Sequence, residues 1–426
     1  MIARYSVDVP FWDQWQFVRF LQWLYEGRLS LAHLWRQHNE HRVFFPRIIL
    51  LLLARVSGWS ISYELAANVL LGVGIFAVLL WQVRASRRLL GDRGPNWLLP
   101  AISLMVFSLG QWENWVWGWE ICIFLSVLAV VAGITVLATA GSKWWRLPAA
   151  SFLGVVASYS FASGLVYWPA ALPVLLACPA RSWRSKTRET LAWLLCAVAT
   201  IALYLYHYHA PASRPRPSLA LAHPVQLAKY ILVYLGSPVS TDHALRAGGL
   251  GLAALLVVVV SLRRSLGPSG AQLSFPYLSY CLYALLSAAM TGMGRLGFGV
   301  TQALSSRYVT MGNLLWISII TLLYLLAKSQ VSHATDRRPP GGLRRLGSAV
   351  AGAALILTVL FSLRVSLGAL PSMAADHSRR AAALAELVSA TDGSVPRAIY
   401  PYPEQRRTEV SVLKRYHLSV FRQHRS

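Results

Sequence analysis

Side chains that can move protons and bind anions are concentrated in one polar segment, residues 8–47, ahead of the first long apolar run. Asp8 and Asp13 lie near its start, and residues 38–42 near its end read His-Asn-Glu-His-Arg. A carboxylate can accept the proton of a hydroxyl group, and an arginine can hold a phosphate through two parallel hydrogen bonds. We therefore interpret this segment as the catalytic part of the chain, with group transfer to a hydroxyl as its chemistry.

Later parts of the chain supply further groups of the same kinds. They are Glu113, Asn114 and Glu120 in the tryptophan-rich stretch 111–120, and Arg295 and Arg307 in the glycine-rich stretch 291–307. If these stretches lie on the same side of a membrane as the opening segment, acids and arginines meet at one surface. That combination favours transfer from a lipid-phosphate donor, because arginines would hold the leaving phosphate.

Composition places the chain in a membrane. Of its 426 residues, 56% are hydrophobic and only 13% are charged, whereas soluble domains carry roughly 25% charged residues. The net charge of +24 would indicate nucleic acid binding in a soluble protein. Here most basic residues flank apolar runs, where they orient helices, so we expect no nucleic acid partner. The cysteines lie in apolar runs without CxxC spacing, which predicts neither a zinc site nor a disulfide framework.

The apolar runs predict an all-α, polytopic transmembrane helical bundle with about ten spans. The predicted spans are 62–83, 97–109, 121–139, 147–159, 165–178, 190–206, 248–262, 273–290, 311–327 and 347–367. The run 227–239 is too short to cross, because a crossing helix needs about 20 residues, so we expect it to be interfacial or re-entrant. Three regions follow: an outer catalytic loop (1–47), a transmembrane domain (48–367) and a basic outer tail (368–426).

The basic residues set the orientation of these spans. Clusters at 84–93, 143–146, 181–188, 263–264 and 328–345 belong in the cytoplasm by the positive-inside rule. The opening segment, the tryptophan-rich stretch, the 291–307 loop and the tail then lie outside. This arrangement leaves the N-terminus outside with no span before it. Either the chain inserts with its N-terminus outside, or one further helix lies upstream of the sequence given, and we favour the second.

The opening segment itself has helical signals. Apolar residues recur at helical spacing after Asp13 and predict an amphipathic helix that Gly27 ends. Ser30 can cap a second short helix that reaches Gln37. We expect both helices to lie in the membrane interface, with their aromatic side chains at headgroup depth.

The histidines of residues 38–42 are weak evidence for a metal. The sequence His-Asn-Glu-His lacks the HExxH spacing of zinc proteases. We assign no metal ligand, favour hydrogen-bonding roles for His38 and His41, and leave a divalent metal open.

Several short motifs together resemble a known group of proteins. They are DVPFWDQW at 8–15, HNEHR at 38–42, PR at 46–47, QWEN at 111–114, WG at 117–118, SG at 163–164, WP at 168–169 and SRY at 306–308. They resemble a group of bacterial integral membrane proteins that is similar to the GT-C superfamily of polyprenyl-phosphate-sugar-dependent glycosyltransferases. That superfamily includes the aminoarabinose transferases, the protein O-mannosyltransferases and rhizobial lipopolysaccharide core transferases.

The resemblance implies a site as well as an activity. It implies a catalytic acid in the first outer loop, here Asp8 and then Asp13, and contacts from Arg295 or Arg307 to the lipid phosphate. With the residues above, the predicted substrate-binding set is His38, Asn39, Glu40, His41, Arg42, Glu113, Asn114, Arg295, Arg307 and Tyr308. We expect a multi-pass protein of a bacterial inner membrane that moves a sugar from polyprenyl phosphate to a cell-envelope acceptor on the outer face.

Other functions fit the composition too. A transporter or flippase of lipid-linked sugars would place ionisable groups near the midplane, whereas the acids noted here cluster outside the predicted spans. An O-antigen polymerase or ligase would also use lipid-linked sugars, but with its important groups in a large later loop. A non-catalytic scaffold would tolerate alanine at the outer acids.

Overall fold

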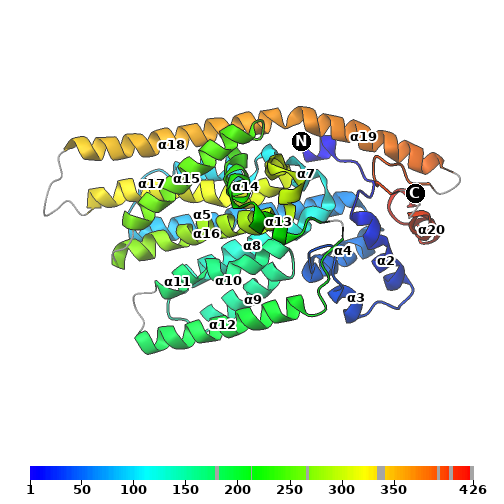
Figure 1. Ribbon diagram of the computed structural model, residues 1–426, viewed down its shortest axis with the longest axis horizontal. Coiled ribbons are helices and arrows are strands. Elements are labelled where there is room, and N and C mark those ends of the chain that lie inside the picture. Colours follow the sequence, from blue (N-terminus) through cyan, green and yellow to red (C-terminus); the bar gives the residue numbers. More distant parts are fainter. Residues whose placement is uncertain are drawn as a thin grey trace.

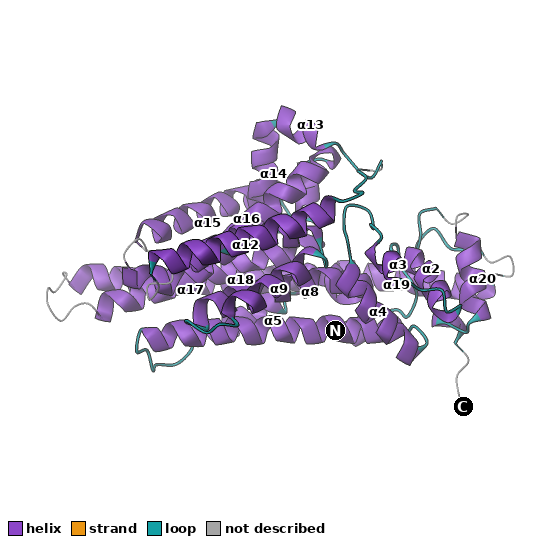
Figure 2. Cartoon of the chain, turned by 90° about the horizontal axis from the view of Figure 1, so that it is seen from below, coloured by secondary structure: helices purple, strands orange, loops and turns teal. Residues whose placement is uncertain are grey.

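The computed structural model is an elongated bundle of helices with a cluster of short helices at one end (Figure 1). The structure describes residues 1–177, 182–212, 214–264, 268–332, 341–390, 394–402 and 406–422. Within these ranges the fold is all-α, as predicted, and the only extended pairing is an isolated bridge between His38 and His41. Figure 2 shows the same arrangement from a second direction.

Among the described residues, seven helices are long and apolar enough to cross a membrane, which supports a multi-pass membrane protein. They cover Ile61–Leu89, Gly118–Thr139, Trp183–Leu205, Ala244–Arg263, Gly270–Phe298, Ser306–Lys328 and Ala351–Ser389. In the labels of Figure 1 they are built on α5 (Ile61–Leu89), α8 (Ile121–Thr139), α12 (Trp183–Leu205), α15 (Ala244–Arg264), α16 (Pro268–Arg295), α17 (Val309–Ser332) and α18 (Gly341–Gly368), which leads into α19 (Leu370–Ser389). Each corresponds to one of the predicted spans, and only α12 falls short of its span, by one residue, because it ends at Leu205.

The other three predicted spans correspond to shorter helices. Residues 97–109 form α6 (Leu98–Val106), and 147–159 form α9 (Arg146–Ser158). Residues 165–178 fall in η3 (Ala162–Val166), α10 (Tyr167–Ala170) and α11 (Leu172–Leu176), where Pro169 and Pro173 interrupt a continuous helix; Cys178 lies outside the described residues. The run 227–239 lies in α14 (Pro224–Gly236) and η4 (Ser237–Val239), and α14 is indeed too short to cross.

Burial differs among the long helices. α17 is largely enclosed by its neighbours, whereas α12, α15 and α18 leave most of their surface open. The open faces carry leucines such as Leu195, Leu256 and Leu360. Contiguous apolar faces of this size are unfavourable in water, so they indicate contact with lipid.

The predicted basic clusters lie together at the end away from the short helices. Asp92, just after α5, forms an ion pair of 2.9 Å with Arg87 and accepts a hydrogen bond from Tyr324 near the end of α17. Burial opposes ionisation of Asp92, but these two hydrogen bonds lower its pKa to about 2. Arg146 pairs at 3.1 Å with Glu189, at the start of α12. Parts of the predicted clusters, such as 333–340, lie outside the described residues.

The opposite end of the bundle is a small domain, which we call the cap. It consists of α1 (Ile2–Tyr5), α2 (Gln14–Tyr25), α3 (Leu31–Trp35), α4 (Phe44–Ser57), α19, α20 (Arg407–Arg415) and η9 (Ser419–Phe421). The sequence predicted α2 and α3, and Ser30 does cap α3. It did not separate α4, which is a short helix of its own.

The cap has an apolar core that joins the two ends of the chain. Phe17 and Phe20 of α2 are buried in this core, and the ring of Phe17 lies beside those of Trp59 and Trp119. The tail supplies the other side of this core: Trp12 N donates to the carbonyl of Ile399 at 2.9 Å. The apolar face of α2 therefore packs inside the protein, in part against α20 of the tail, which is far away in sequence.

Candidate functional site

A tight turn at residues 38–41 projects polar side chains from the cap toward the bundle. His38 and His41 exchange two backbone hydrogen bonds of 2.8 Å each, and Asn39 takes a left-handed backbone with φ of 49°. Gln37 secures the turn from outside: its Nε2 donates to the carbonyls of Asn39 at 2.5 Å and of His209 at 2.6 Å. The turn is therefore anchored to the loop that follows α12.

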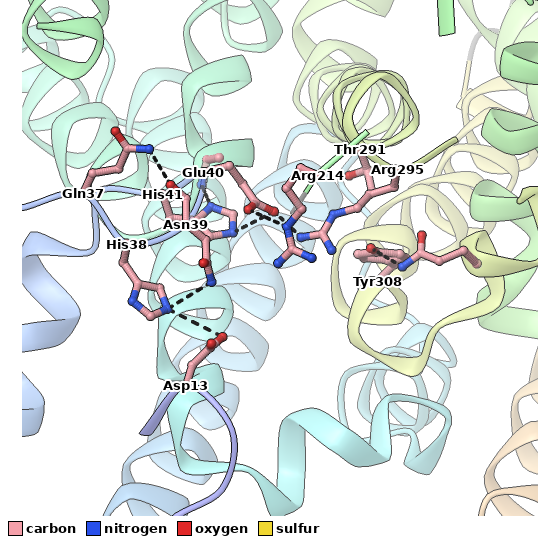
Figure 3. A network of polar contacts seen from close by, with 12 residues as sticks. Asp13, Gln37, His38, Asn39, Glu40, His41, Arg214, Thr291, Arg295 and Tyr308 are labelled. Atoms are coloured by element: carbon pink, nitrogen blue, oxygen red, sulfur yellow. Dashed lines mark hydrogen bonds and ion pairs between the residues drawn. The ribbon is translucent and has the colours of Figure 1, made fainter. Parts of the chain in front are cut away.

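Asp13 faces this turn from the start of α2. Its carboxylate makes no capping hydrogen bond to the helix and instead lies 3.6 Å from Nε2 of the buried His38 (Figure 3). Burial alone would raise the pKa of Asp13, but His38, with Arg307 and Arg214 farther away, holds that pKa below its usual value. Asp13 is thus ionised at neutral pH.

Buried contacts fix the position of Asp13. The next residue, Gln14, accepts a hydrogen bond from the backbone N of Phe11 at 3.0 Å and donates to Glu64 of α5 at 2.5 Å. Trp59 Nε1 donates to the second oxygen of Glu64 at 2.9 Å. The start of α2 is therefore tied to the first turn of a long helix.

Glu40 is the centre of an ion-pair cluster. One carboxylate oxygen accepts a hydrogen bond from Arg295, at the end of α16, and the other lies 3.2 Å from Nε of Arg214. His41 Nε2 lies 3.6 Å away. Burial would raise the pKa of Glu40, but His41 and the two arginines lower it to about 2. Figure 3 shows both guanidinium groups pointing at this carboxylate.

His41 is a neutral, fixed imidazole at physiological pH. Its ring stacks on Phe161 at a centroid distance of 4.2 Å, and its Nδ1 accepts a hydrogen bond from the backbone N of Ala162 at 3.1 Å. Burial, only partly offset by Glu40, lowers the pKa of His41 to about 4. Because Nδ1 is an acceptor, the proton of the neutral ring is on Nε2, which faces Glu40.

Arg307 differs from Arg214 and Arg295 because its guanidinium contacts an acid and a ring without a short hydrogen bond to either. It lies in η7 (Ser306–Tyr308), with Nε 3.8 Å from Glu113 and its guanidinium 5.8 Å from the ring centre of Trp117. Its buried Nε has no hydrogen-bond partner. A buried guanidinium nitrogen that lacks a partner is costly unless a ligand satisfies it.

The two remaining predicted residues of this region have supporting contacts. Asn114 is fully buried and donates to the carbonyl of Arg307 at 3.1 Å and to Thr310 at 2.7 Å, so it positions the backbone of Arg307. Tyr308 accepts a hydrogen bond of 2.8 Å from Gln302 and stacks on Tyr234 at 5.1 Å.

These groups surround one small cavity of about 50 Å³ at the junction of cap and bundle. Its polar lining consists of Asp13, Asn39, His41, Glu120, Arg214, Arg295, Arg307 and Tyr308. Trp117, Trp119 and Phe161 supply aromatic walls. The volume holds a few water molecules, so a sugar-sized ligand requires the surrounding loops to move apart.

Two predicted residues lie elsewhere. Asp8 accepts hydrogen bonds from the backbone N of Ile61 at 2.7 Å and from Ser60 at 2.9 Å, and pairs with Arg422. It therefore caps α5 and joins it to the tail. Arg42 donates to the carbonyls of Tyr204 at 2.6 Å and Trp35 at 3.0 Å, so it secures the end of α12.

The structure also adds residues that the sequence did not single out. Arg214 comes from the Pro-rich loop after α12. Gln37 ends the segment before the turn. Their roles depend on contacts across 120 residues or more of sequence, as in Arg214 with Glu40 or Gln37 with His209. Among the described residues, no group of three or more His, Cys, Asp or Glu side chains is arranged to hold a metal ion.

Comparison with known proteins gives no relative for this chain: no protein-family model, no curated protein and no solved structure matches it. The resemblance to lipid-dependent glycosyltransferases therefore stays a prediction.

Proposed function

We propose that the chain is a GT-C-like glycosyltransferase of a bacterial inner membrane. It transfers a sugar from a polyprenyl-phosphate donor to a hydroxyl of a cell-envelope acceptor, such as lipopolysaccharide or another polysaccharide, on the outer face. One observation carries this proposal: an ionised carboxylate, Asp13, and three arginines line one cavity where a lipid-facing helical bundle meets its cap.

The cavity provides a group for each part of such a reaction. The acceptor hydroxyl would give its proton to Asp13 while its oxygen attacks the anomeric carbon of the donor sugar. The bond between that carbon and the phosphate oxygen breaks, and polyprenyl phosphate leaves with the electron pair. Attack from the side opposite the phosphate inverts the anomeric configuration.

Asp13 fits the role of base better than Asp8. Asp13 lines the cavity and its carboxylate has only His38 at short range. Both carboxylate oxygens of Asp8 are already engaged, by Ser60, Ile61 and Arg422. A base must be within hydrogen-bond reach of the proton that it accepts, so Asp13 is our assignment.

The arginines divide the work of holding the phosphate. Arg307 has no hydrogen bond at Nε, and its contacts are an ion pair of 3.8 Å with Glu113 and the ring of Trp117, so its guanidinium has the capacity to bind a new anion. Arg214 and Arg295 are held by Glu40, which fixes their position and offsets part of their charge. A preorganised cluster of this kind stabilises charge that develops on a leaving phosphate.

The first test is a glycan and lipid-linked-sugar profile of cells that lack the gene, complemented with wild type, Asp13→Asn or Asp8→Asn. We expect the deletion to lose one envelope sugar and to accumulate its polyprenyl-phosphate form. Wild type should restore the sugar, and Asp13→Asn should not.

The matched variant Asp8→Asn should restore the sugar in proportion to the amount of protein in the membrane. The membrane level of each variant is measured by immunoblot so that loss of protein is not read as loss of catalysis. An unchanged envelope in the deletion strain, or full restoration by Asp13→Asn, would contradict the proposal.

A further inference from the structure

A second, larger hollow of about 530 Å³ opens beside the candidate site. It lies between the start of α7 (Trp112–Val116), the loop after η4, the segment from η6 (Val300–Leu304) to η7, and the junction of α18 and α19. Its lining mixes hydroxyls, charges and apolar side chains. We call it the side groove.

An arginine pair stands at the mouth of the side groove. Asp242, in the loop before α15, lies 2.6 Å from Nη1 of Arg246 and 2.9 Å from Nη2 of Arg364, near the end of α18. Two guanidinium groups share a single carboxylate, so the mouth has one excess positive charge. Ser240 donates a hydrogen bond of 2.9 Å to the same carboxylate, and Thr241 also lines the groove with a hydroxyl group. Arginines with neighbouring hydroxyls form a typical phosphate site.

Apolar surface continues from the groove down the bundle. Phe361, Val365, Leu304 and Val239 line it. The helices that bear its two arginines, α15 and α18, both present leucines to the outside, and Leu245, at the level of the mouth, is 94% exposed. α17 packs against both helices and forms the floor between them. A hydrocarbon chain can therefore lie along this face while its polar end reaches the arginines.

The groove and the catalytic cavity share a wall. Glu113 and Ser306 line the groove, and Ser306 donates a hydrogen bond to Glu113. On the other side of Glu113 lies Arg307, at 3.8 Å, which lines the cavity with Asp13. A ligand that moves past Glu113 would therefore pass from the side groove into the cavity that contains Asp13.

We propose that the side groove is the entry site for the lipid phosphate of the donor. Arg246 and Arg364 receive the phosphate at the mouth, the hydrocarbon chain lies between α15 and α18, and Arg307 takes over the phosphate as the sugar enters the cavity. This inference rests on the proposed function and names the route by which its donor arrives. The lipid-facing helices on both sides of the mouth favour a lipid over a soluble glycan.

Binding can be measured on the purified full chain in detergent, with undecaprenyl phosphate as the probe and undecaprenol, which lacks the phosphate, as the matched ligand. We expect wild type to bind the phosphate form more tightly. The double variant Arg246→Ala, Arg364→Ala should bind it about tenfold or more weakly, because two charge-assisted contacts are lost. Arg263→Ala, an exposed arginine at the far end of α15, is the control and should bind like wild type.

Asp242→Asn separates binding from folding. It removes the competing carboxylate and should raise the affinity for undecaprenyl phosphate, a gain that damage to the fold cannot produce. Inorganic phosphate at millimolar concentration should compete only weakly, since it lacks the chain. Competition by inorganic phosphate that is as effective as by the lipid would overturn the lipid assignment.

Two outcomes distinguish this inference from the proposed function. If the double arginine variant binds undecaprenyl phosphate as tightly as wild type, the side groove is not the entry site. If that variant binds the lipid normally but no longer transfers sugar to the acceptor, the groove binds the acceptor instead. Asp13→Asn should still bind the lipid phosphate. If wild type transfers no sugar but its arginines still bind undecaprenyl phosphate, the proposed transferase activity is wrong and the proposed lipid-phosphate site is supported.

Discussion

Nε2 of His38 lies 3.6 Å from the carboxylate of Asp13 and fixes the electrostatic state of that acid. His38 is buried, and its backbone belongs to the same turn that carries Glu40 and His41. One turn thus supports both the proposed base and the arginines that face it. The site depends on this turn more than on any single helix.

His38→Gln should shift the pH dependence of transfer. His38 lowers the pKa of Asp13, so its loss raises that pKa, and the acid limb of kcat/KM against pH should move to higher pH. His38 is a positioning residue, and a purely structural defect would lower the rate at every pH without moving the limb. His223→Gln, at an exposed histidine outside the cavity, should leave the profile in place.

Glu40→Gln should weaken transfer by roughly 10- to 100-fold, because Arg214 and Arg295 lose the carboxylate that positions them, and small displacements of binding groups are costly. Steady-state kinetics with a lipid-linked sugar would measure it. The matched control is Glu386→Gln on the exposed face of α19. A wild-type rate of transfer in Glu40→Gln would show that Arg214 and Arg295 do not need the Glu40 carboxylate to be positioned.

His41 should make the protein less stable in mild acid. Its folded pKa is about 4, below the usual 6.5, so between these values the unfolded chain binds more protons than the folded one. Stability is therefore complete above about pH 6.5 and declines as the pH falls toward 4. Thermal unfolding at pH 7 and pH 5 should show a smaller difference for His41→Gln than for wild type. An equal difference in both proteins would assign the acid sensitivity to other groups.

Asp8→Asn should lower the thermal stability of the cap. The change weakens the hydrogen bond from Asp8 to the first backbone N–H of α5 and the ion pair of Asp8 with Arg422. Loss of a hydrogen bond of this kind at the start of a helix costs about 1 kcal/mol. Differential scanning fluorimetry of the purified protein would detect the lower Tm. Arg19→Ala, an exposed change on α2, should leave the Tm unaltered, and an unaltered Tm in Asp8→Asn would argue for a role outside the cap.

Much of the frame could be read from the sequence because its signals are local. Apolar length predicted each of the long helices, and Asp13, Gly27 and Ser30 predicted α2 and α3. Short helices failed this criterion: α6 and α9 have the apolar character of spans without the length. The tail was read as a separate region because nothing in its own sequence shows that α2 is its partner.

The sequence indicated some residues of the candidate site and missed others. Asp13, Glu40, Arg295 and Arg307 do meet, because they lie at the ends of elements that reach the same end of the bundle. Residue type cannot say which partner a polar side chain will find, so Asp8 and Arg42 were expected in the site and instead secure helix ends. Arg214 was missed because the Pro-rich loop that bears it has no periodic pattern.

The cap contains both the first helices of the chain, such as α2, and the last, α19 and α20. A chain that leaves one end of a bundle and returns to it must run between the two ends an even number of times. The long apolar helices in the described ranges number seven, which is odd, so shorter ones must carry the chain from end to end as well. Loss of any one helix that runs between the two ends would leave α20 at the end of the bundle opposite α2. The core that α20 shares with α2 could then not form. The shared core of α2 and α20 therefore makes the cap depend on every helix that carries the chain between the two ends.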